Sequence, residues 1–500
     1  MPAPYAQTGI LTNLFLNVRT LLNEPIFKGM IGSIIFEPIV KPRPKHVEDE
    51  SVGDFVRRRF GPTITDNLLS ALFHGIYAGD IYKLSARTLL PKLWFLETRD
   101  PEGSGIIVEL AELRTKNEQI YSSSDFDTAQ GITGSPFGAP GEQLPDLEMF
   151  KTLISTMPQQ SVYTFTKGIG QLTSQLESQL RQNPNVKIID NIEVSFMDRD
   201  ASSGSVTVRS FGRPGDTSKK HDYVISTLPP STLSKCHVIG PDPSPSPVAE
   251  AISDTATVMV VNLYYTNQNL TDPYRGFGYL IPQSIPMEQN PERALGVIFA
   301  SETSGPRGPQ TSSSTDLPTR WSTNHQDTAP GTKLTVMLGG HWWADWADSD
   351  LPIPSTAIEM AKTVLARHMG ITETPVIAKA KLQRDAIPQY RVGHRKAMSR
   401  MHDELQWSHG RLRVAGPAWQ GGVGVNDCVR KAWEVVEDLA SGQDRDRDGE
   451  GWKTGIESYG REEKWVVLRK RRVSAEDAAR SAESENRRVV EEMKRKVGRE

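Results

Sequence analysis

The stretch Leu412–Arg430, LRVAGPAWQGGVGVNDCVR, decides the fold that the sequence predicts. A short apolar run stops at Gly416, and glycines cluster at Gly421, Gly422 and Gly424. Apolar residues then recur at the spacing of one helix face: Val425, Val429, Ala432, Val436 and Leu439. The stretch therefore predicts a strand, a glycine turn and a helix.

A glycine turn before a helix suits the binding of a negatively charged group. Glycines let the backbone approach a ligand closely, and the unpaired N–H groups of a helix start favour negative charge. Asn426 or Asp427 can cap the helix. A tight turn with a good cap explains the motif equally well, so both interpretations stay open.

Composition narrows the class of protein. Five hundred residues suffice for two or three domains, and the net charge of −3 with no basic, aromatic-interleaved patch argues against a nucleic-acid partner. The two cysteines, Cys236 and Cys428, exclude a disulfide framework and a cysteine-rich metal site. No apolar run reaches the length of a membrane span.

Residues from Ser51 to about Glu97 read as helices. Ser51 with Asp54 resembles a capping box, Gly61 ends the first helix, and Gly75 closes the next apolar stripe. Upstream, the segment 26–36 is unusually apolar. A buried helix is the first expectation for it, and an exposed apolar surface that rests on a membrane is the alternative.

The middle of the chain alternates strands with low-complexity segments. Tyr121–Pro145 reads as a long loop and Gln171–Leu180 as a helix. Three short strands then predict a small meander: Val186–Ile189, Val206–Ser210 and Tyr223–Ser226. A second block predicts an antiparallel sheet from Thr257–Tyr265, Phe277–Ile281, Leu295–Ala300 and Leu334–Gly339. Val376–Leu382 is predicted as the next strand.

Composition and periodicity predict three further segments. The Ser-, Pro- and Gly-rich insertion 301–331 is expected to be disordered, and a helix is expected from Pro354 to His368. Beyond Gly442 the charged sequence predicts a solvated appendage without a catalytic role.

The scattered histidines and absent motifs exclude several chemistries. No Ser-His-Asp or Cys-His pairing, HExxH or paired CxxC is present, which leaves no catalytic residue and no metal site to assign. His74 lies beside an apolar helical stripe, where a lone histidine is more often a structural hydrogen-bonding group than a base. The remaining possibility is an enzyme whose cofactor supplies the reactivity.

Seven blocks of the sequence resemble the protoporphyrinogen oxidase family of FAD-dependent, amine-oxidase-like flavoproteins. They occur in the family's order between Glu24 and Leu439. The blocks are SVGDFVRRRFG (51–61), HGIYAGDIYKLSART (74–88), VVNLYY (260–265), GFGYLIP (276–282), TVMLGG (335–340), AIPQYRVGH (386–394) and GVGVNDCVR (422–430).

The resemblance implies a mixed α/β fold. It implies an incomplete Rossmann-like FAD/NAD(P)-binding domain, an antiparallel-sheet substrate domain and a helical membrane-binding domain. The expected boundaries are a helical membrane-binding and substrate region at 1–120, a loop-rich connection at 121–160, FAD-domain segments at 161–250 and 386–440, the substrate sheet at 251–385, and a charged, partly helical tail at 441–500.

The resemblance also implies an activity and a site. The reaction is oxidation of protoporphyrinogen IX to protoporphyrin IX by molecular oxygen through FAD, at the mitochondrial inner membrane as a peripheral protein. A homodimer and contact with ferrochelatase are further implied. Carried over by motif, Gly422, Val423, Gly424 and Val425 contact the flavin end of FAD, and Val194 contacts its adenine end. Phe277, Gly278, Leu280 and Met337 line the substrate pocket.

One element of the family pattern is missing from the sequence. The chain contains no strand–GxGxxG–helix fingerprint for the FAD pyrophosphate. We expect an incomplete gene model, with the fingerprint encoded upstream of Met1. The alternatives are another FAD-dependent oxidase or desaturase on the same scaffold, and a truncated, non-catalytic paralogue.

Overall fold

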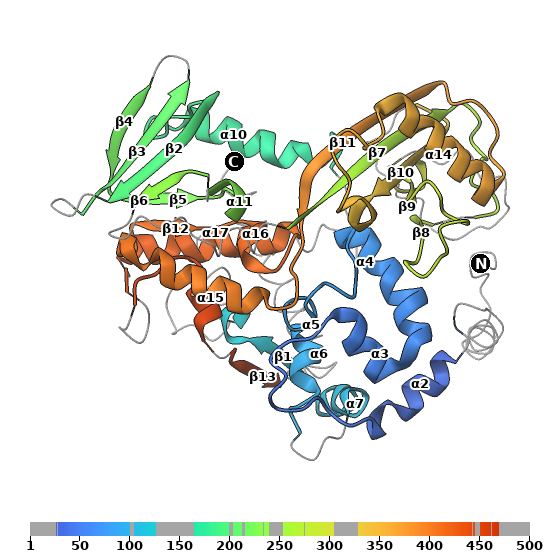
Figure 1. Cartoon of the computed structure of the whole chain (residues 1–500), viewed down its shortest axis with the longest axis horizontal. Coiled ribbons are helices and arrows are strands. Elements are labelled where there is room, and N and C mark those ends of the chain that lie inside the picture. The colour runs from blue at the N-terminus through green and yellow to red at the C-terminus, as the bar shows by residue number, and fades with distance from the viewer. Residues whose placement is uncertain are drawn as a thin grey trace, which may run out of the picture.

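The computed structural model describes residues 27, 29–100, 105–126, 165–199, 204–212, 216–233, 235–239, 254–274, 276–304, 329–442, 444–445, 451–461 and 463–469. These residues form a helical part, a five-stranded sheet, and a third part made of two smaller sheets and several helices (Figure 1). The predicted mixture of helix and sheet is confirmed.

The helical part consists of eight consecutive elements. They are α2 Met30–Phe36, η2 Glu37–Ile39, α3 Val52–Thr63, η3 Ile64–Leu69, α4 Ser70–Tyr77, α5 Ala86–Leu89, α6 Pro91–Leu96 and α7 Ile106–Lys116. Ser51 caps α3 by accepting from the Asp54 N–H at 2.9 Å, as predicted, and the chain kinks at Gly61, whose φ is 78°. The predicted end at Gly75 is wrong, because α4 continues to a left-handed Ala78 with φ of 50°.

The apolar segment at the start of this part is exposed. No residue of α2 is buried, and the apolar surface consists of Ile34, Ile35, Phe36 and Ile39, which are 37%, 65%, 62% and 78% exposed. The expectation of a buried helix is therefore wrong for the residues that the structure describes, since α2 packs on α3 and η2 without burying any of its own residues. Among the described helices, none combines the length and apolar character needed to cross a membrane.

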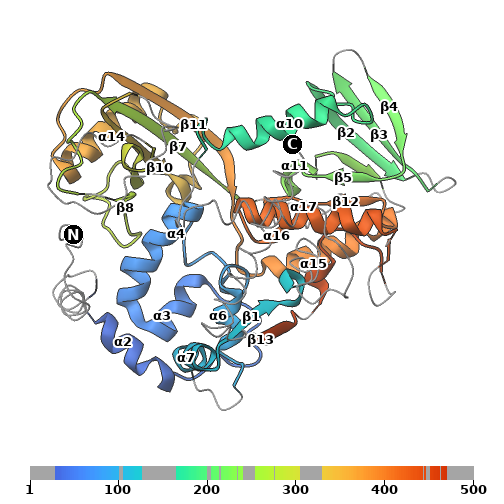
Figure 2. The ribbon, with the colours of Figure 1, turned by 180° about the vertical axis from the view of Figure 1, so that it is seen from behind.

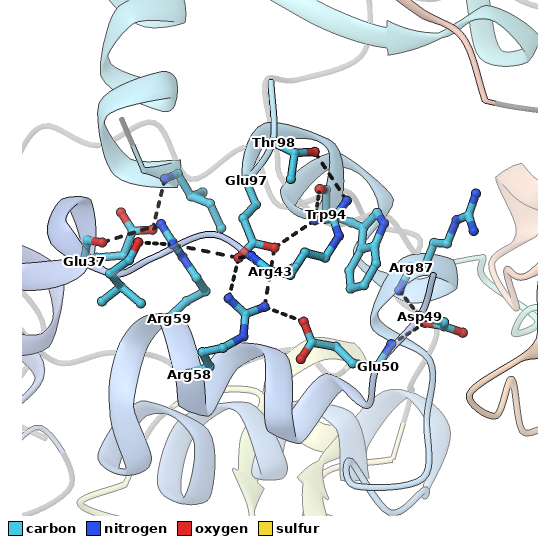
Figure 3. Close-up of polar contacts among 12 residues, drawn as sticks. Glu37, Arg43, Asp49, Glu50, Arg58, Arg59, Arg87, Trp94, Glu97 and Thr98 are labelled. Carbon is cyan, nitrogen blue, oxygen red and sulfur yellow. Dashed lines mark hydrogen bonds and ion pairs between the residues drawn. The ribbon is translucent and has the colours of Figure 1, made fainter. Parts of the chain in front are cut away.

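A buried network of charges holds this apolar surface to the helical part (Figure 3). The Glu37 carboxylate pairs with the buried Arg59 guanidinium and accepts from the Ile106 and Ile107 N–H groups at the start of α7, both at 3.0 Å. The fully buried Glu97 carboxylate accepts from Arg43 and Arg58. Because each buried carboxylate has cationic and N–H partners, its desolvation is compensated.

The central sheet is antiparallel throughout and has the order β11-β7-β10-β9-β8. Its strands are β7 Thr255–Tyr265, β8 Gly278–Leu280, β9 Ala294–Phe299, β10 Thr332–Gly339 and β11 Ile377–Pro388. Helix α14, Pro354–Met369, packs on one face and buries Ala357, Ala361, Val364 and Leu365 in the core. All five predicted strands and the helix after Pro354 are confirmed; α13, Ala300–Ser304, opens the insertion, whose residues 305–328 lie outside the described ones.

The third part contains a parallel strand pair and a four-stranded sheet. Strand β12, Leu412–Val414, pairs in parallel with β5, Val224–Ser226. The other sheet has the order β4-β3-β2-β6, from β2 Ile192–Arg199, β3 Val206–Gly212, β4 Thr217–His221 and β6 His237–Ile239. The accompanying helices are α10 Gly170–Gln182, α11 Pro230–Leu233, α15 His394–Leu405, η5 Gln406–Ser408, α16 Pro417–Gln420 and α17 Val425–Ala440.

Two strand predictions in this part are corrected. Residues 186–189 form no strand, because Val186 turns back to the Asn183 carbonyl after α10. The strand at 223–226 is real but leaves the meander and pairs with β12, nearly two hundred residues later. Local patterning finds strands but not their partners.

Helix α17 and the charged tail that follows it also differ from expectation. The predicted apolar stripe of α17 is exposed, with Val425, Val429 and Val436 at 47%, 55% and 56%, although the helix itself is confirmed. The tail is not wholly a solvated appendage: η6, Glu457–Gly460, and β13, Trp465–Arg469, pack on the protein, and β13 pairs with β1, Glu118–Ser122. Figure 2 shows β1 and β13 side by side.

Candidate flavin and substrate site

The glycine turn adopts the geometry that its sequence requires. Gly421 has a left-handed φ of 71°, and the Gly424 N–H donates to Asp427 Oδ2 at 3.1 Å. A Cβ on Gly422 would lie 2.4 Å from that same carboxylate oxygen. Of the two predicted caps, Asp427 closes the start of α17 from its third position, whereas the N-cap itself is Gly424, and a side chain at position 422 would have to displace the Asp427 carboxylate.

Buried polar groups without partners lie beside this turn. Ser226 Oγ at the end of β5 and both amide atoms of Gln420 at the end of α16 are buried with no hydrogen-bond partner in the described structure. They follow the carboxyl ends of the parallel strands β5 and β12, where α/β folds bind ligands. Unpaired buried donors and acceptors are costly, so these residues fit a polar cofactor such as a flavin dinucleotide.

His394 extends the same region. Its Nε2 is buried without a partner in the described residues, and burial followed by the neighbouring Arg395 charge lowers the pKa of His394 to about 3. The imidazole is therefore neutral at physiological pH. His394 and Tyr390 line a small hollow with Pro229 and Ala418, which places the hollow next to the ends of β5 and β12.

Val194, the residue predicted at the adenine end, lies away from the turn on β2. It is half-buried and packs against the core cluster that contains Val414 and Trp419. Trp419 precedes the glycine turn by two residues and donates from Nε1 to the Leu228 carbonyl at 2.7 Å. The structure thus connects Val194 to the turn through a shared core.

Three of the predicted substrate residues lie on one face of the sheet. Leu280 of β8 is paired with Gly296 of β9, and Gly296 is paired with Met337 of β10. Residues directly opposite each other share a sheet face, so Leu280 and Met337 flank a glycine that has no side chain. Gly278 lies on the same face one row further along, opposite Ile298, whereas Phe277 precedes β8 and is 61% exposed.

An apolar helix stripe adjoins this sheet face. Leu68, Leu72 and Ile76 of η3 and α4 are 45%, 47% and 44% exposed. A Cβ on Gly75 would lie 2.9 Å from Leu280 Cδ1, so the helix and the strand are in direct contact there. We call the surface formed by Leu68, Leu72, Ile76, Leu280 and Ile298 the apolar face.

A pair of histidines fastens the elements that form the apolar face. His74 Nδ1 donates to the Ile281 carbonyl at 2.6 Å after β8, and its Nε2 lies 2.9 Å from Nε2 of His341 after β10. Since a carbonyl only accepts, neutral His74 accepts at Nε2 from His341. Burial, and then the neighbouring His74, lower the pKa of His341 to about 4, and burial also lowers the pKa of His74.

Sequence reasoning gave His74 a structural hydrogen bond, which is confirmed, but missed His341 and Gly296. An isolated glycine inside a predicted strand signals the close approach of a neighbouring group, and this signal could have identified Gly296. Nothing local to His341 indicated a partner 267 residues away. Among the described residues no group of three His, Cys, Asp or Glu side chains is arranged to hold a metal ion.

A glycine turn at the end of a parallel strand pair, beside a separate antiparallel sheet with an apolar face, is the arrangement of a two-part flavoenzyme. The chain belongs to the flavin containing amine oxidoreductase family, which matches residues 8–440. It is therefore an oxidoreductase of mixed α/β fold. Membership in this family supports the predicted FAD cofactor.

Several similar proteins are named as porphyrinogen oxidases. Protoporphyrinogen oxidase of Schizosaccharomyces pombe is 28% identical over 446 residues, which cover 86% of this chain and 79% of that protein. Coproporphyrinogen III oxidase of Bacillus subtilis is 23% identical over 406 residues, covering 80% of this chain and 69% of that protein. The crystal structure of a protein from Exiguobacterium sp. 255-15 shares the fold with a TM-score of 0.54 at 19% identity, covering 85% of this chain and 74% of that one.

Proposed function

We propose that this protein oxidises protoporphyrinogen IX to protoporphyrin IX, with molecular oxygen as the final electron acceptor. The coarser activity, flavin-dependent oxidation of a porphyrinogen, is supported by relatives named for two porphyrinogen substrates. The observation that carries the finer proposal is the row Leu280–Gly296–Met337 beside the stripe Leu68–Ile76.

The apolar face suits a large, flat macrocycle. Gly75 and Gly296 leave room for the Leu280 side chain, whose Cδ atoms lie 2.9 Å from the points that a Cβ on either glycine would occupy, and the helix stripe adds a second apolar wall. Pockets for apolar ligands are lined mostly by apolar side chains, which orient the ligand with few polar groups. Protoporphyrinogen carries vinyl groups where coproporphyrinogen carries extra carboxylates, and the apolar face offers the latter no cationic side chain of its own.

The chain's own groups would hold FAD and exclude water around the reacting atoms. The turn from Gly421 to Val425, Ser226 and Gln420 would contact the cofactor, which supplies hydride acceptance when bound. The neutral His74–His341 pair holds the helix stripe against β8 and β10, so that the apolar face keeps one shape. Position rather than acid–base strength is what a hydride transfer requires.

The test compares two substrates and two variants. Protein supplied with FAD should produce the red fluorescence of protoporphyrin from protoporphyrinogen IX faster than it produces coproporphyrin from coproporphyrinogen III. Leu72→Glu should raise KM for protoporphyrinogen, whereas Leu110→Glu, a change of the same kind at a 37% exposed leucine on α7, should not. Faster oxidation of coproporphyrinogen would reassign the substrate, and flavin reduction only by an amine or polyene would reject the porphyrinogen proposal.

We also propose that the apolar surface of Ile34, Ile35, Phe36 and Ile39 rests on a membrane. Its support is the exposure of four large apolar side chains on a segment that the Glu37–Arg59 pair holds in place. The mitochondrial inner membrane, a homodimer and a contact with ferrochelatase stay predictions of the resemblance.

A further inference from the structure

A strap at the C-terminal end folds back across the molecule. We define the strap as residues 451–461 and 463–469, all beyond residue 440, where the family match ends. Ile456 is fully buried, and Trp465 stacks on Phe95 of α6 with 4.8 Å between ring centroids and 16° between planes. Strand β13 of the strap pairs with β1 over five residues. The strap is therefore an integral part of the fold.

The strap is hydrogen-bonded to β12, the strand that leads into the glycine turn. The Val414 N–H of β12 donates to the Thr454 carbonyl at 2.8 Å, and the Thr454 hydroxyl lies 2.7 Å from His402 Nδ1 on α15. The backbone hydrogen bonds to β5 are made by Arg411 and Ala415. Val414 alternates with these residues along the strand, so its N–H points to the opposite edge of β12, where the strap lies. The Glu457 carboxylate fixes the local bend by accepting from the Thr454 and Gly455 N–H groups.

Tyr459 brings the strap to the glycine turn itself. Its hydroxyl oxygen lies 3.3 Å from the point that a Cβ on Gly421 would occupy, and Thr88 Cγ2 lies 2.8 Å from that point. The Tyr459 ring is perpendicular to His394 with centroids 5.8 Å apart, and the Arg395 guanidinium lies 5.1 Å from the ring centroid. Gly421 is thus packed between α5 and the strap, in a backbone conformation that only glycine adopts without strain.

We propose that the strap is part of the flavin site, and that Tyr459 is the positioning residue that holds the turn from Gly421 to Val425. The inference deepens the proposed function and rests on it, because the turn is the segment predicted to contact the flavin. If the turn is already held in its binding conformation, it loses little conformational entropy when FAD binds, and the affinity for FAD is higher. Tyr459 acts through Gly421 and His394 rather than by contact with the reacting atoms.

The test uses the full chain with three substitutions on the strap. Tyr459→Ala removes the ring, Tyr459→Phe keeps the ring without its hydroxyl, and Trp465→Ala is the matched control because it removes a half-buried aromatic residue from the same strap at its far end. Two quantities are measured: amide hydrogen exchange of residues 416–425 without FAD, and the dissociation constant of FAD from the change in flavin fluorescence.

We expect Tyr459→Ala to speed exchange within residues 416–425 and to weaken FAD binding roughly twofold to tenfold, the range for loss of a buried aromatic pair. Tyr459→Phe should restore both to near the wild-type values. Trp465→Ala should speed exchange in residues 118–122 while leaving residues 416–425 unchanged. If Tyr459→Ala lowers global stability, Tyr459→Leu, which keeps most of the volume, takes its place.

The inference is overturned if residues 416–425 exchange at the same rate in Tyr459→Ala as in Trp465→Ala. Where Tyr459→Leu replaces Tyr459→Ala, the same comparison applies to it. The exchange result decides this whether or not the protein binds FAD. The two proposals fail separately. If exchange and FAD affinity respond as expected while no porphyrinogen is oxidised, the strap keeps its role and the proposed substrate is rejected.

Discussion

Neutralising the buried carboxylate of Glu97 should destabilise the helical part severely. The Glu97 oxygens accept four hydrogen bonds, from Arg43 N, Arg43 Nη1, Arg58 Nη1 and Arg58 Nη2, and the side chain is fully buried. In Glu97→Gln the amide keeps one acceptor oxygen and turns an NH₂ group toward cationic donors. Figure 3 shows how these guanidinium groups converge on the one carboxylate.

The magnitude follows from the number and burial of the lost contacts. Removing one partner of a buried ion pair costs about 3–5 kcal/mol, since an uncompensated charge stays buried. The Arg58 side chain is 29% exposed and the Arg43 side chain 11%, so water can solvate part of the released charge. We therefore expect a loss near the lower end, about 3 kcal/mol.

Equilibrium urea unfolding followed by circular dichroism measures this loss. Glu112→Gln on α7 is the matched control, because Glu112 pairs with Lys116 while 48% of its side chain is exposed, and such pairs contribute about 0–1 kcal/mol. If the Glu97 and Glu112 variants lose equal stability, the network is not the source of stability that the geometry indicates.

The same carboxylate gives a pH dependence whose sign is fixed. Burial alone would raise the pKa of Glu97, but the hydrogen bonds and charges of Arg58 and Arg43 outweigh it and hold the pKa below its usual value. The unfolded chain therefore binds the proton more readily, and the contribution of Glu97 is present above the unfolded pKa and lost as pH falls through the folded pKa. Glu97→Gln should lack this part of the acid sensitivity.

Three further changes have defined outcomes. Because the folded pKa of His341 lies near 4, below its unfolded value, its contribution to stability is present above about pH 6.5 and falls as the pH drops toward 4. When the urea concentration at the midpoint of unfolding is plotted against pH, His341→Gln should make the curve flatter in this range. An unchanged curve would contradict the pairing of His341 with His74. Replacing Ile35 and Phe36 by serine should reduce the fraction of protein that sediments with phospholipid vesicles, whereas Leu110→Ser should not. Asp427→Ala removes the acceptor for the Gly424 N–H and should lower the free energy of unfolding, measured by thermal unfolding, by about 1 kcal/mol. An unchanged stability would show that this hydrogen bond does not stabilise the start of α17.

Local signals in the sequence located most of the elements correctly. Ser51 with Asp54 marked the start of α3, and the β-branched and aromatic runs marked the strands of the central sheet. The glycine cluster marked the turn before α17, and Asp427 was named as one of two possible caps. Capping, strand propensity and glycine turns act over a few residues, so short windows of sequence contain them.

Pairings across long distances escaped the same reasoning. The partner of β5 lies nearly two hundred residues away in β12, and His74 meets His341 across 267 residues. The segment 26–36 and the stripe of α17 showed where apolar side chains lie, but exposure depends on what the rest of the chain places against them. For the candidate site, motifs suggested Leu280 and Met337, and only strand register put them on one face around Gly296.

By itself the sequence determined most of the helices and strands, the glycine turn and the resemblance to a flavoprotein family, because these signals lie in short stretches of neighbouring residues. The tertiary structure decided that the charged tail contains a strap, that Tyr459 packs on Gly421, and that an apolar face forms between α4 and β8. These features depend on contacts between distant segments, whose free energy comes from mutual burial and correct register. No single stretch of the chain contains that information.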